Sequence, residues 1–218
     1  MKKVVLLGIL LFLTVPQFSF AGTEVINQLR FFYGQNQINP SEVNDLADTA
    51  SLKQFKKVNH FGVEAMRVLI PQLNLGFRLG LKNYTSNPTD ESSTNNYYAT
   101  LNQINYTAVL ASPLVKTDRF QMEVVAGFGT SDSSLKIKSA TEDGTYTSSK
   151  SIPTLFGGLS FAYGYKYVFL KIEGGYEYNK ADNLSKSGTL TTSIKKLDFS
   201  GTYFNVGLLI DGLALGRL

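Results

Sequence analysis

The chain has 218 residues, of which 43% are hydrophobic and 17% are charged, and it contains no cysteine. This charged fraction lies below the roughly 25% of an average soluble domain, and the missing cysteines exclude a disulfide framework and a cysteine-linked lipid anchor. Two of the 21 basic residues lie at the N-terminus, which leaves 19 against 17 acidic residues. Charge therefore gives no reason to expect nucleic acid as a partner.

The first 21 residues have the pattern of a secretory signal peptide. Two lysines precede an apolar run from Val4 to Val15, and Ser19-Phe20-Ala21 has the small-x-small form of a cleavage site. The apolar run is too short to span a bilayer as a helix. We therefore expect a signal peptide over residues 1–21, cleavage near Ala21, and one domain over residues 22–218.

Eight later segments show the alternation of apolar and polar residues that is typical of β-strands. The pattern is cleanest in 73–81, where large apolar residues hold every odd position, and in 120–129. A short helix is expected after Pro40, near Val43. In chain order the strands are expected at about 25–36, 57–70, 73–85, 97–111, from 120, from 152, from 168, and around 204–210.

Short and long connections alternate along the chain. Short turns are predicted at Pro71, at 113–118 and at Tyr165-Lys166. The long polar connections are 39–56, 86–96, a ribbon over 131–151 with its turn at Glu142-Asp143-Gly144-Thr145, and a stretch around 185–188. All long connections then lie on one side of an antiparallel meander, as they do in transmembrane barrels. Because lipid leaves no partner for unpaired backbone groups, such strands can span only as a closed barrel.

The sequence thus predicts an all-β fold: an eight-stranded antiparallel up-and-down transmembrane β-barrel with long outer loops and short periplasmic turns. The tight turn at Pro71 also predicts the register between its two strands. If Leu69 pairs with Leu73, Glu64 lies opposite Arg78 and His60 lies opposite Lys82, on the face away from lipid. Opposite charges at facing positions favour this register.

The same parity, applied to every strand, predicts a polar network inside the barrel, with glycines at many of the remaining interior positions. Three positive and four negative charges in it nearly cancel. A soluble lipocalin-like barrel that binds a ligand is an alternative, with the apolar face inside and the polar face outside. The predicted interior network consists of Glu64, Arg78, Lys82, Glu123, Lys171, Glu173 and Glu177.

In these respects the chain resembles the small outer-membrane β-barrels of Gram-negative bacteria, the group of the OmpA transmembrane domain, OmpX and OmpW. The resemblance rests on the leader ending SFA, the bands LNLGFRLGL and FQMEVVAGF, the turn at Tyr165-Lys166 and the alternating connections. It covers the whole mature chain and is architectural. It implies a location in the cell outer membrane, contact with outer-membrane lipid, lipopolysaccharide and the barrel insertion machinery, and no particular activity.

Two features depart from that group. Such barrels usually finish on an aromatic residue, whereas this chain finishes on Leu218, after an Asp211-Gly212 pair that could turn the chain back. Tryptophan is also absent, so tyrosines are expected to form the aromatic girdles at the membrane surfaces. The tyrosines assigned to the girdles are Tyr33, Tyr84, Tyr163, Tyr167 and Tyr178.

No catalytic group, metal site or cofactor is predicted. The only histidine, His60, is expected at the outer rim of the barrel; a lipid-modifying enzyme with His60 as base and Glu64 as its orienting group is an alternative. The main functional hypothesis is a structural or surface-interaction role carried by 39–56, 131–151 and 181–196. A narrow channel for ions or small solutes is a further alternative, so the partner is either a surface protein or a small solute.

Overall fold

The structure is a computed structural model, and it describes residues 27–49, 52–86, 98–138, 142–148, 151–182, 184–191 and 193–213. The predicted signal peptide, most of the predicted polar loop over 86–96, and Leu218 lie outside the described residues. The signal peptide and the domain boundary at residue 22 therefore stay predictions. No helix among the described residues is long and apolar enough to cross a membrane.

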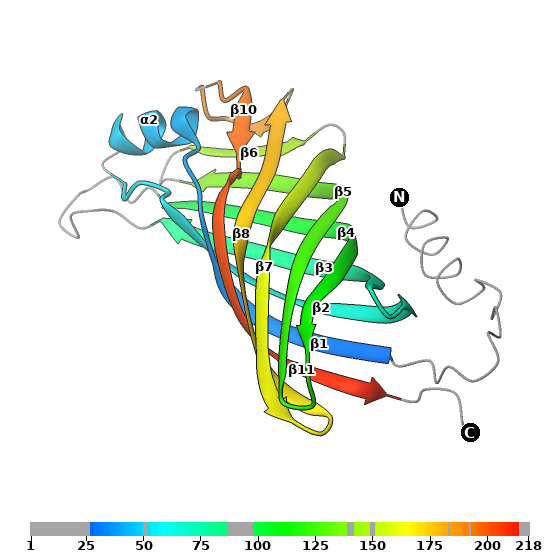
Figure 1. Cartoon of the computed structure of the whole chain (residues 1–218). Coiled ribbons are helices and arrows are strands. Elements are labelled where there is room, and N and C mark those ends of the chain that lie inside the picture. Colours follow the sequence, from blue (N-terminus) through cyan, green and yellow to red (C-terminus); the bar gives the residue numbers. More distant parts are fainter. Residues whose placement is uncertain are drawn as a thin grey trace.

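Eight long strands form a closed antiparallel barrel, which confirms the predicted fold class (Figure 1). Each strand pairs with the next one along the chain, and the last pairs with the first: Phe31 lies opposite Leu208 on one side and Val63 on the other. The barrel strands are β1 (Asn27–Gln37), β2 (Lys57–Ile70), β3 (Leu73–Ser86), β4 (Tyr98–Lys116), β5 (Phe120–Lys138), β7 (Ile152–Tyr165), β8 (Val168–Asp182) and β11 (Gly201–Leu213).

The short turns lie together at one end of the barrel, as predicted. The β7–β8 turn places Lys166 in the left-handed region, with φ of 55°. The predicted β2–β3 register holds as far as Val68, opposite Asn74, but the pairing of Leu69 with Leu73 is wrong. Ile70 pairs with Leu73 instead, because a bulge absorbs one residue beside the turn. The closing strand β11 continues through Asp211 rather than turning there.

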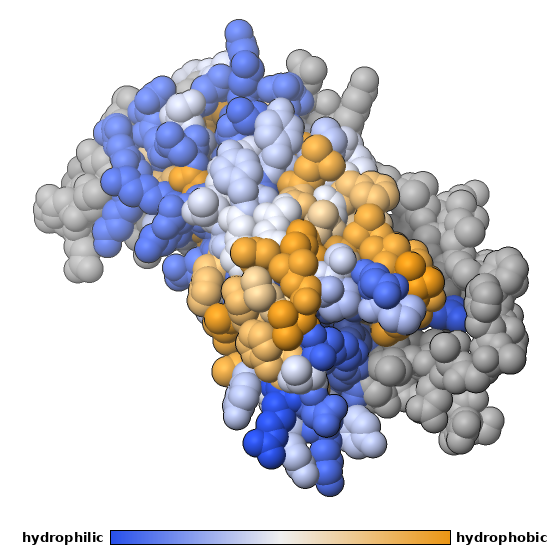
Figure 2. Space-filling view, in the orientation of Figure 1, coloured by the Kyte–Doolittle hydropathy of each residue, from blue (hydrophilic) through white to orange (hydrophobic). Residues whose placement is uncertain are grey.

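The outward face of the barrel carries an apolar belt. Large hydrophobic side chains are exposed on every barrel strand except β3, whose outward leucines are half-buried. Figure 2 shows this belt between two hydrophilic ends. Tyr33 and Tyr178 are exposed near its outer edge, while Tyr163 and Tyr167 are exposed beside the β7–β8 turn. An apolar exterior around a polar interior is the arrangement of a membrane-spanning barrel, so the lipocalin-like alternative, which needs the reverse, is wrong.

The long connections form a folded outer lobe at the other end (Figure 1). It contains α2 (Ser41–Thr49), β6 (Asp143–Ser148), β9 (Leu184–Gly188) and β10 (Lys196–Asp198). The turn predicted at residues 142–145 is wrong, because β6 has already begun at Asp143 and pairs there with Lys138. The stretch predicted as a connection around 185–188 is strand β9, because it finds a partner in β6, about forty residues earlier.

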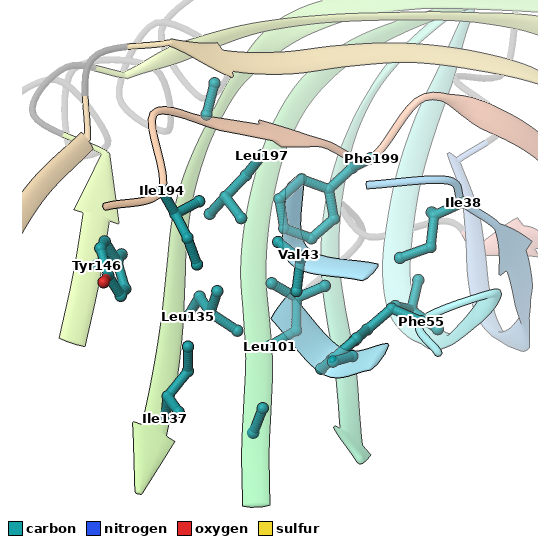
Figure 3. Close-up of a cluster of buried hydrophobic side chains, with 14 of the residues drawn as sticks. Ile38, Val43, Phe55, Leu101, Leu135, Ile137, Tyr146, Ile194, Leu197 and Phe199 are labelled. Atoms are coloured by element: carbon teal, nitrogen blue, oxygen red, sulfur yellow. The ribbon is translucent and has the colours of Figure 1, made fainter. Parts of the chain in front are cut away.

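Apolar side chains from these connections pack together inside the lobe (Figure 3). In α2, Val43, Leu46 and Ala47 recur at helical spacing and face this cluster. The long connections, predicted as polar, are polar only on their outward side, and their inward residues bury a common core. Among the described residues the cluster consists of Ile38, Val43, Ala47, Leu52, Phe55, Val58, Ala99, Leu101, Leu135, Ile137, Tyr146, Ile152, Ala181, Leu190, Ile194, Leu197 and Phe199.

Leu159→Arg tests the lipid-facing assignment. Leu159 is exposed at the middle of the apolar run of β7, so arginine there should lower the free energy of unfolding of the liposome-inserted barrel by about 2–4 kcal/mol. The matched control is Thr147→Arg, at an exposed site in β6, which should change it by less than about 0.5 kcal/mol. Urea titration, followed by tyrosine fluorescence or circular dichroism, measures the free energy of unfolding of both variants. Equal effects of the two arginines would contradict the assignment.

Candidate functional site: the barrel lumen and its outer cap

The structure places all seven residues of the predicted network inside the barrel. Each has at most 4% of its surface exposed, and they come from β2, β3, β5 and β8. Their side chains point inward because successive residues of a strand alternate between the two faces of the wall. The buried charges are therefore brought together in a narrow space, where each needs a partner of opposite sign.

Arg78 is at the centre of the network. Its Nε donates to Glu64 Oε2 at 2.7 Å, and its two terminal nitrogens donate to the two oxygens of Glu173, each at 2.9 Å. The fork of a guanidinium matches a carboxylate in this two-point geometry. The opposition of Glu64 and Arg78 across the β2–β3 ladder is as the register predicts.

Arg30 is a member of the network that the sequence prediction missed. It is 1% exposed, ion-pairs with Glu173, and has Glu64 4.0 Å away. The signal is present in the strand pattern: the large apolar residues Leu29, Phe31 and Tyr33 alternate on one face, which places the intervening Arg30 on the opposite, inner face.

Two further ion pairs lie on either side of this centre. Toward the short turns, Lys171 Nζ lies 2.6 Å from Glu123 Oε2, which also accepts a hydrogen bond from Ser160 at 3.2 Å. Toward the outer lobe, Lys82 ion-pairs with Glu177. Asn36 and Asn105 donate to the same Glu177 carboxylate at 3.2 and 3.3 Å.

With Arg30 included, the network holds four positive and four negative side chains, so the lumen has no net charge from these groups. Aromatic rings complete the central layer: the Arg78 guanidinium lies 4.4 Å from the ring centre of Phe156 and 5.3 Å from that of Phe32. The Phe156 ring lies so close to Gly127 that a Cβ at this glycine would overlap it. Glycine in β5 therefore makes room for the ring that covers the central ion pair.

A layer of uncharged polar side chains lies above the ion pairs. Asn179 Nδ2 donates to Ser131 and Thr154 at 2.8 and 2.7 Å, and Gln103 Nε2 donates to Asn179 and Ser133 at 3.0 and 2.8 Å. These bonds join β4, β5, β7 and β8 across the lumen.

The apolar cluster of the lobe begins directly above that layer. On the inward face of β4 Gln103 is followed by Leu101, and on that of β5 Ser133 is followed by Leu135; both leucines belong to the cluster. Burial there raises the pKa of the Tyr146 phenol. Ion pairs, amides and apolar side chains thus fill the inside of the barrel in successive layers, and the apolar layer caps its outer end.

Two sequence assignments near the cap are wrong. His60 is not a rim residue: it is 3% exposed inside the barrel, with its ring 5.0 Å from that of Phe32. Tyr84 is not a girdle residue, because it packs against the apolar cluster, with its ring 5.2 Å from that of Phe55. Both lie on the inner face of their strands, where the lobe extends the enclosed space beyond the membrane.

No group of three or more potential metal-binding side chains occurs within the described ranges.

Arg78→Met tests whether the central ion pairs support the fold. The substitution leaves Glu64 and Glu173 with one arginine between them, so we expect a loss of about 3–5 kcal/mol in the free energy of unfolding in liposomes. Adding Glu64→Gln should recover part of that loss, because it removes one unpaired charge. The control is Lys180→Gln, which breaks an exposed 3.1 Å pair with Asp198 and should change stability little. A loss no greater than in the control would contradict the analysis.

Comparison with known proteins shows similarity in fold. No family model matches the sequence, and no curated protein matches it. Among solved structures, Ail, the attachment invasion locus protein of Yersinia pestis, is 12% identical over 87% of this chain and 99% of its own, with TM-scores of 0.50 alone and 0.52 in complex with the heparin analogue sucrose octasulfate. OprG of Pseudomonas aeruginosa is 13% identical over 86% of this chain and 94% of its own, with a TM-score of 0.49. With its apolar belt and polar lumen, the chain has the fold of the small eight-stranded outer-membrane β-barrels.

Proposed function

We propose that this outer-membrane protein is a closed barrel that acts through its outer lobe, binding a partner at the cell surface and passing no solute through its lumen. The observation that carries the proposal is the filled interior. A neutral set of buried ion pairs occupies the membrane-spanning part, and a buried apolar cluster covers its outer end.

A channel would require large rearrangements of this interior. A solute would have to displace cluster residues such as Phe55 and Phe199, which have at most 1% of their surface exposed. It would then have to separate Arg78 from Glu173, which leaves two buried charges unpaired at a high cost in free energy. Eight strands enclose only enough space for their own side chains. These facts support a closed lumen over the channel alternative.

The outer lobe has features suited to binding a protein. In the part of the chain that the structure describes, β9 pairs only with β6, and β10 pairs only with β8. Strands with one unpaired edge can receive a strand from a partner. The lobe is also held in one arrangement: Glu42 of α2 accepts hydrogen bonds from the backbone nitrogens of Lys195 and Lys196 at 2.7 and 3.1 Å. A fixed surface loses little conformational entropy when it binds.

The enzyme alternative that used His60 gains no support from this geometry. His60 lies inside the barrel with 3% of its surface exposed, so the barrel wall separates its ring from a lipid substrate in the membrane. Glu64, its intended orienting group, is instead bonded to Arg78.

Planar-bilayer recording tests the closed lumen. We expect the reconstituted full chain to show no stepwise conductance at neutral pH, because the ion pairs and the cap block the path. Glu64→Ala and Arg78→Ala provide the comparison, since they remove lumen charges. Discrete conductance steps in the wild-type protein that change in size in these variants would refute the closed barrel and favour a channel.

Removal of α2 and β9 from the outer lobe tests the surface role. In one variant, residues 39–56 and 183–196 are replaced by short glycine-serine turns. We expect it to keep the heat-dependent band shift of a closed barrel on SDS gels but to lose adherence of expressing cells to cultured epithelial cells and to serum-protein coatings. The control carries Arg119→Gln, at an exposed position of the β4–β5 turn at the opposite end of the barrel. If the variant protein retains the band shift and cells expressing it adhere as well as cells expressing the wild type, the proposed surface role is wrong.

A further inference from the structure

A groove lies at the outer end of β1 to β3, between the loop that precedes β2 and the outward residues of β1 and β2. Its lining contains three amides, two lysines, one tyrosine and no carboxylate. The residues that line it are Gln35, Gln54, Lys56, Lys57, Asn59 and Tyr84.

The strand register fixes the height of this groove relative to the apolar belt. On the outward face of the β1–β2 ladder, the exposed pair Tyr33 and Phe61 is followed by Gln35 opposite Asn59, one alternation further out. Two residues of a strand advance about 7 Å. Since tyrosine is enriched at the membrane–water interface, the exposed Tyr33 places the start of the groove at the level of the lipid head groups.

The groove is held in place by the loop before β2. Phe55 is fully buried; its backbone nitrogen donates to Asn44 Oδ1 at 2.6 Å, and its carbonyl accepts from Asn44 Nδ2 at 3.3 Å. The carbonyl of the next residue, Lys56, accepts a hydrogen bond from the backbone nitrogen of Ile38 at 3.0 Å. With Phe55 anchored inward, its neighbours Gln54 and Lys56 are directed into the groove.

The polar groups of the groove suit an anion. Lys56 and Lys57 are exposed, and neither has an ion pair with a carboxylate of the described residues. The Tyr33 hydroxyl donates to Asn59 Oδ1 at 3.2 Å, which occupies the acceptor of that amide and leaves its NH₂ group to donate. One carboxylate lies nearby: Gln54 Nε2 donates to both oxygens of Asp48 at 3.0 Å.

We propose that this groove binds a phosphate group of an outer-leaflet lipid, that of the lipid A part of lipopolysaccharide. The two lysines supply charge, the Asn59 amide supplies a directed donor, and the exposed aromatic pair below contacts the acyl chains of the same lipid. Phosphate accepts charge-assisted hydrogen bonds from such groups. The position of the groove, just above the apolar belt, favours a lipid phosphate over one free in solution, because only a lipid holds its phosphate at that height.

The test measures binding of fluorescent lipid A to the full chain in phosphatidylcholine nanodiscs. The double variant Lys56→Gln/Lys57→Gln should bind lipid A about 30-fold more weakly, because each lysine near a membrane surface contributes about 1 kcal/mol to the binding free energy. The matched control, Lys186→Gln with Lys195→Gln, removes the same charge from exposed positions of the outer lobe and should alter binding less than about twofold.

Two further probes identify the source of the phosphate. Lipid A without its phosphates should bind the wild-type chain as weakly as intact lipid A binds the groove variant, and inorganic phosphate should not displace lipid A. Unchanged binding in the groove variant, equal losses in the control, equal binding of dephosphorylated lipid A, or displacement by inorganic phosphate would each overturn the proposal. The heat-dependent band shift, measured on every sample, distinguishes these outcomes from loss of the closed barrel.

Discussion

The pairing of β11 with β1 is the constraint on which the rest of the structure depends. Backbone groups in hydrocarbon must all be paired, and a sheet of eight strands has two unpaired edges until its first and last strands meet. The contact between Phe31 and Leu208 belongs to the ladder that removes both edges. Closure also separates the side chains, since each strand then presents one face to lipid and the other to an enclosed space.

The enclosed space explains the chemistry of the interior. A narrow lumen cannot hydrate eight charged side chains separately, so it is stable only if they neutralise one another. Glu173 is an example, because its one carboxylate accepts hydrogen bonds from both Arg30 and Arg78. Beyond the membrane the same inward face becomes apolar, as in the step from Gln103 to Leu101. One set of strands therefore builds a polar interior where the surroundings are lipid and an apolar interior where they are water.

The sequence was sufficient to predict the barrel and much of its interior. Strict alternation reports which face each residue occupies, so it places Glu64 and Arg78 on the same inner face; they lie opposite each other because the bulge beside the turn at Pro71 absorbs one residue. Arg30 lies on the inner face by the same alternation, but the predicted network omits it, because the pattern of β1 is defined by its apolar residues Leu29, Phe31 and Tyr33. The bulge beside Ile70 could not be predicted, since alternation reports the face of each residue but not how many residues the turn itself takes up.

The lobe lay beyond prediction for a different reason. Its apolar residues are scattered through connections that are polar on average, and each is buried only by partners from other connections. Strand β9, for example, has little strand pattern of its own and is defined by its pairing with β6. His60 and Tyr84 were misplaced for the same reason: the sequence does not show that the enclosed space continues past the membrane surface.

The lobe cluster also imposes an order on assembly. Its members extend from Ile38 to Phe199 along the chain, so they cannot pack until the strands that carry them stand side by side. While the connections cross the bilayer, these side chains have no partner, and such transiently exposed surface promotes aggregation. Once across, they bury one another, and the connections cannot return without unfolding the lobe. Withdrawal of the connections through the bilayer would therefore first require this cluster to come apart.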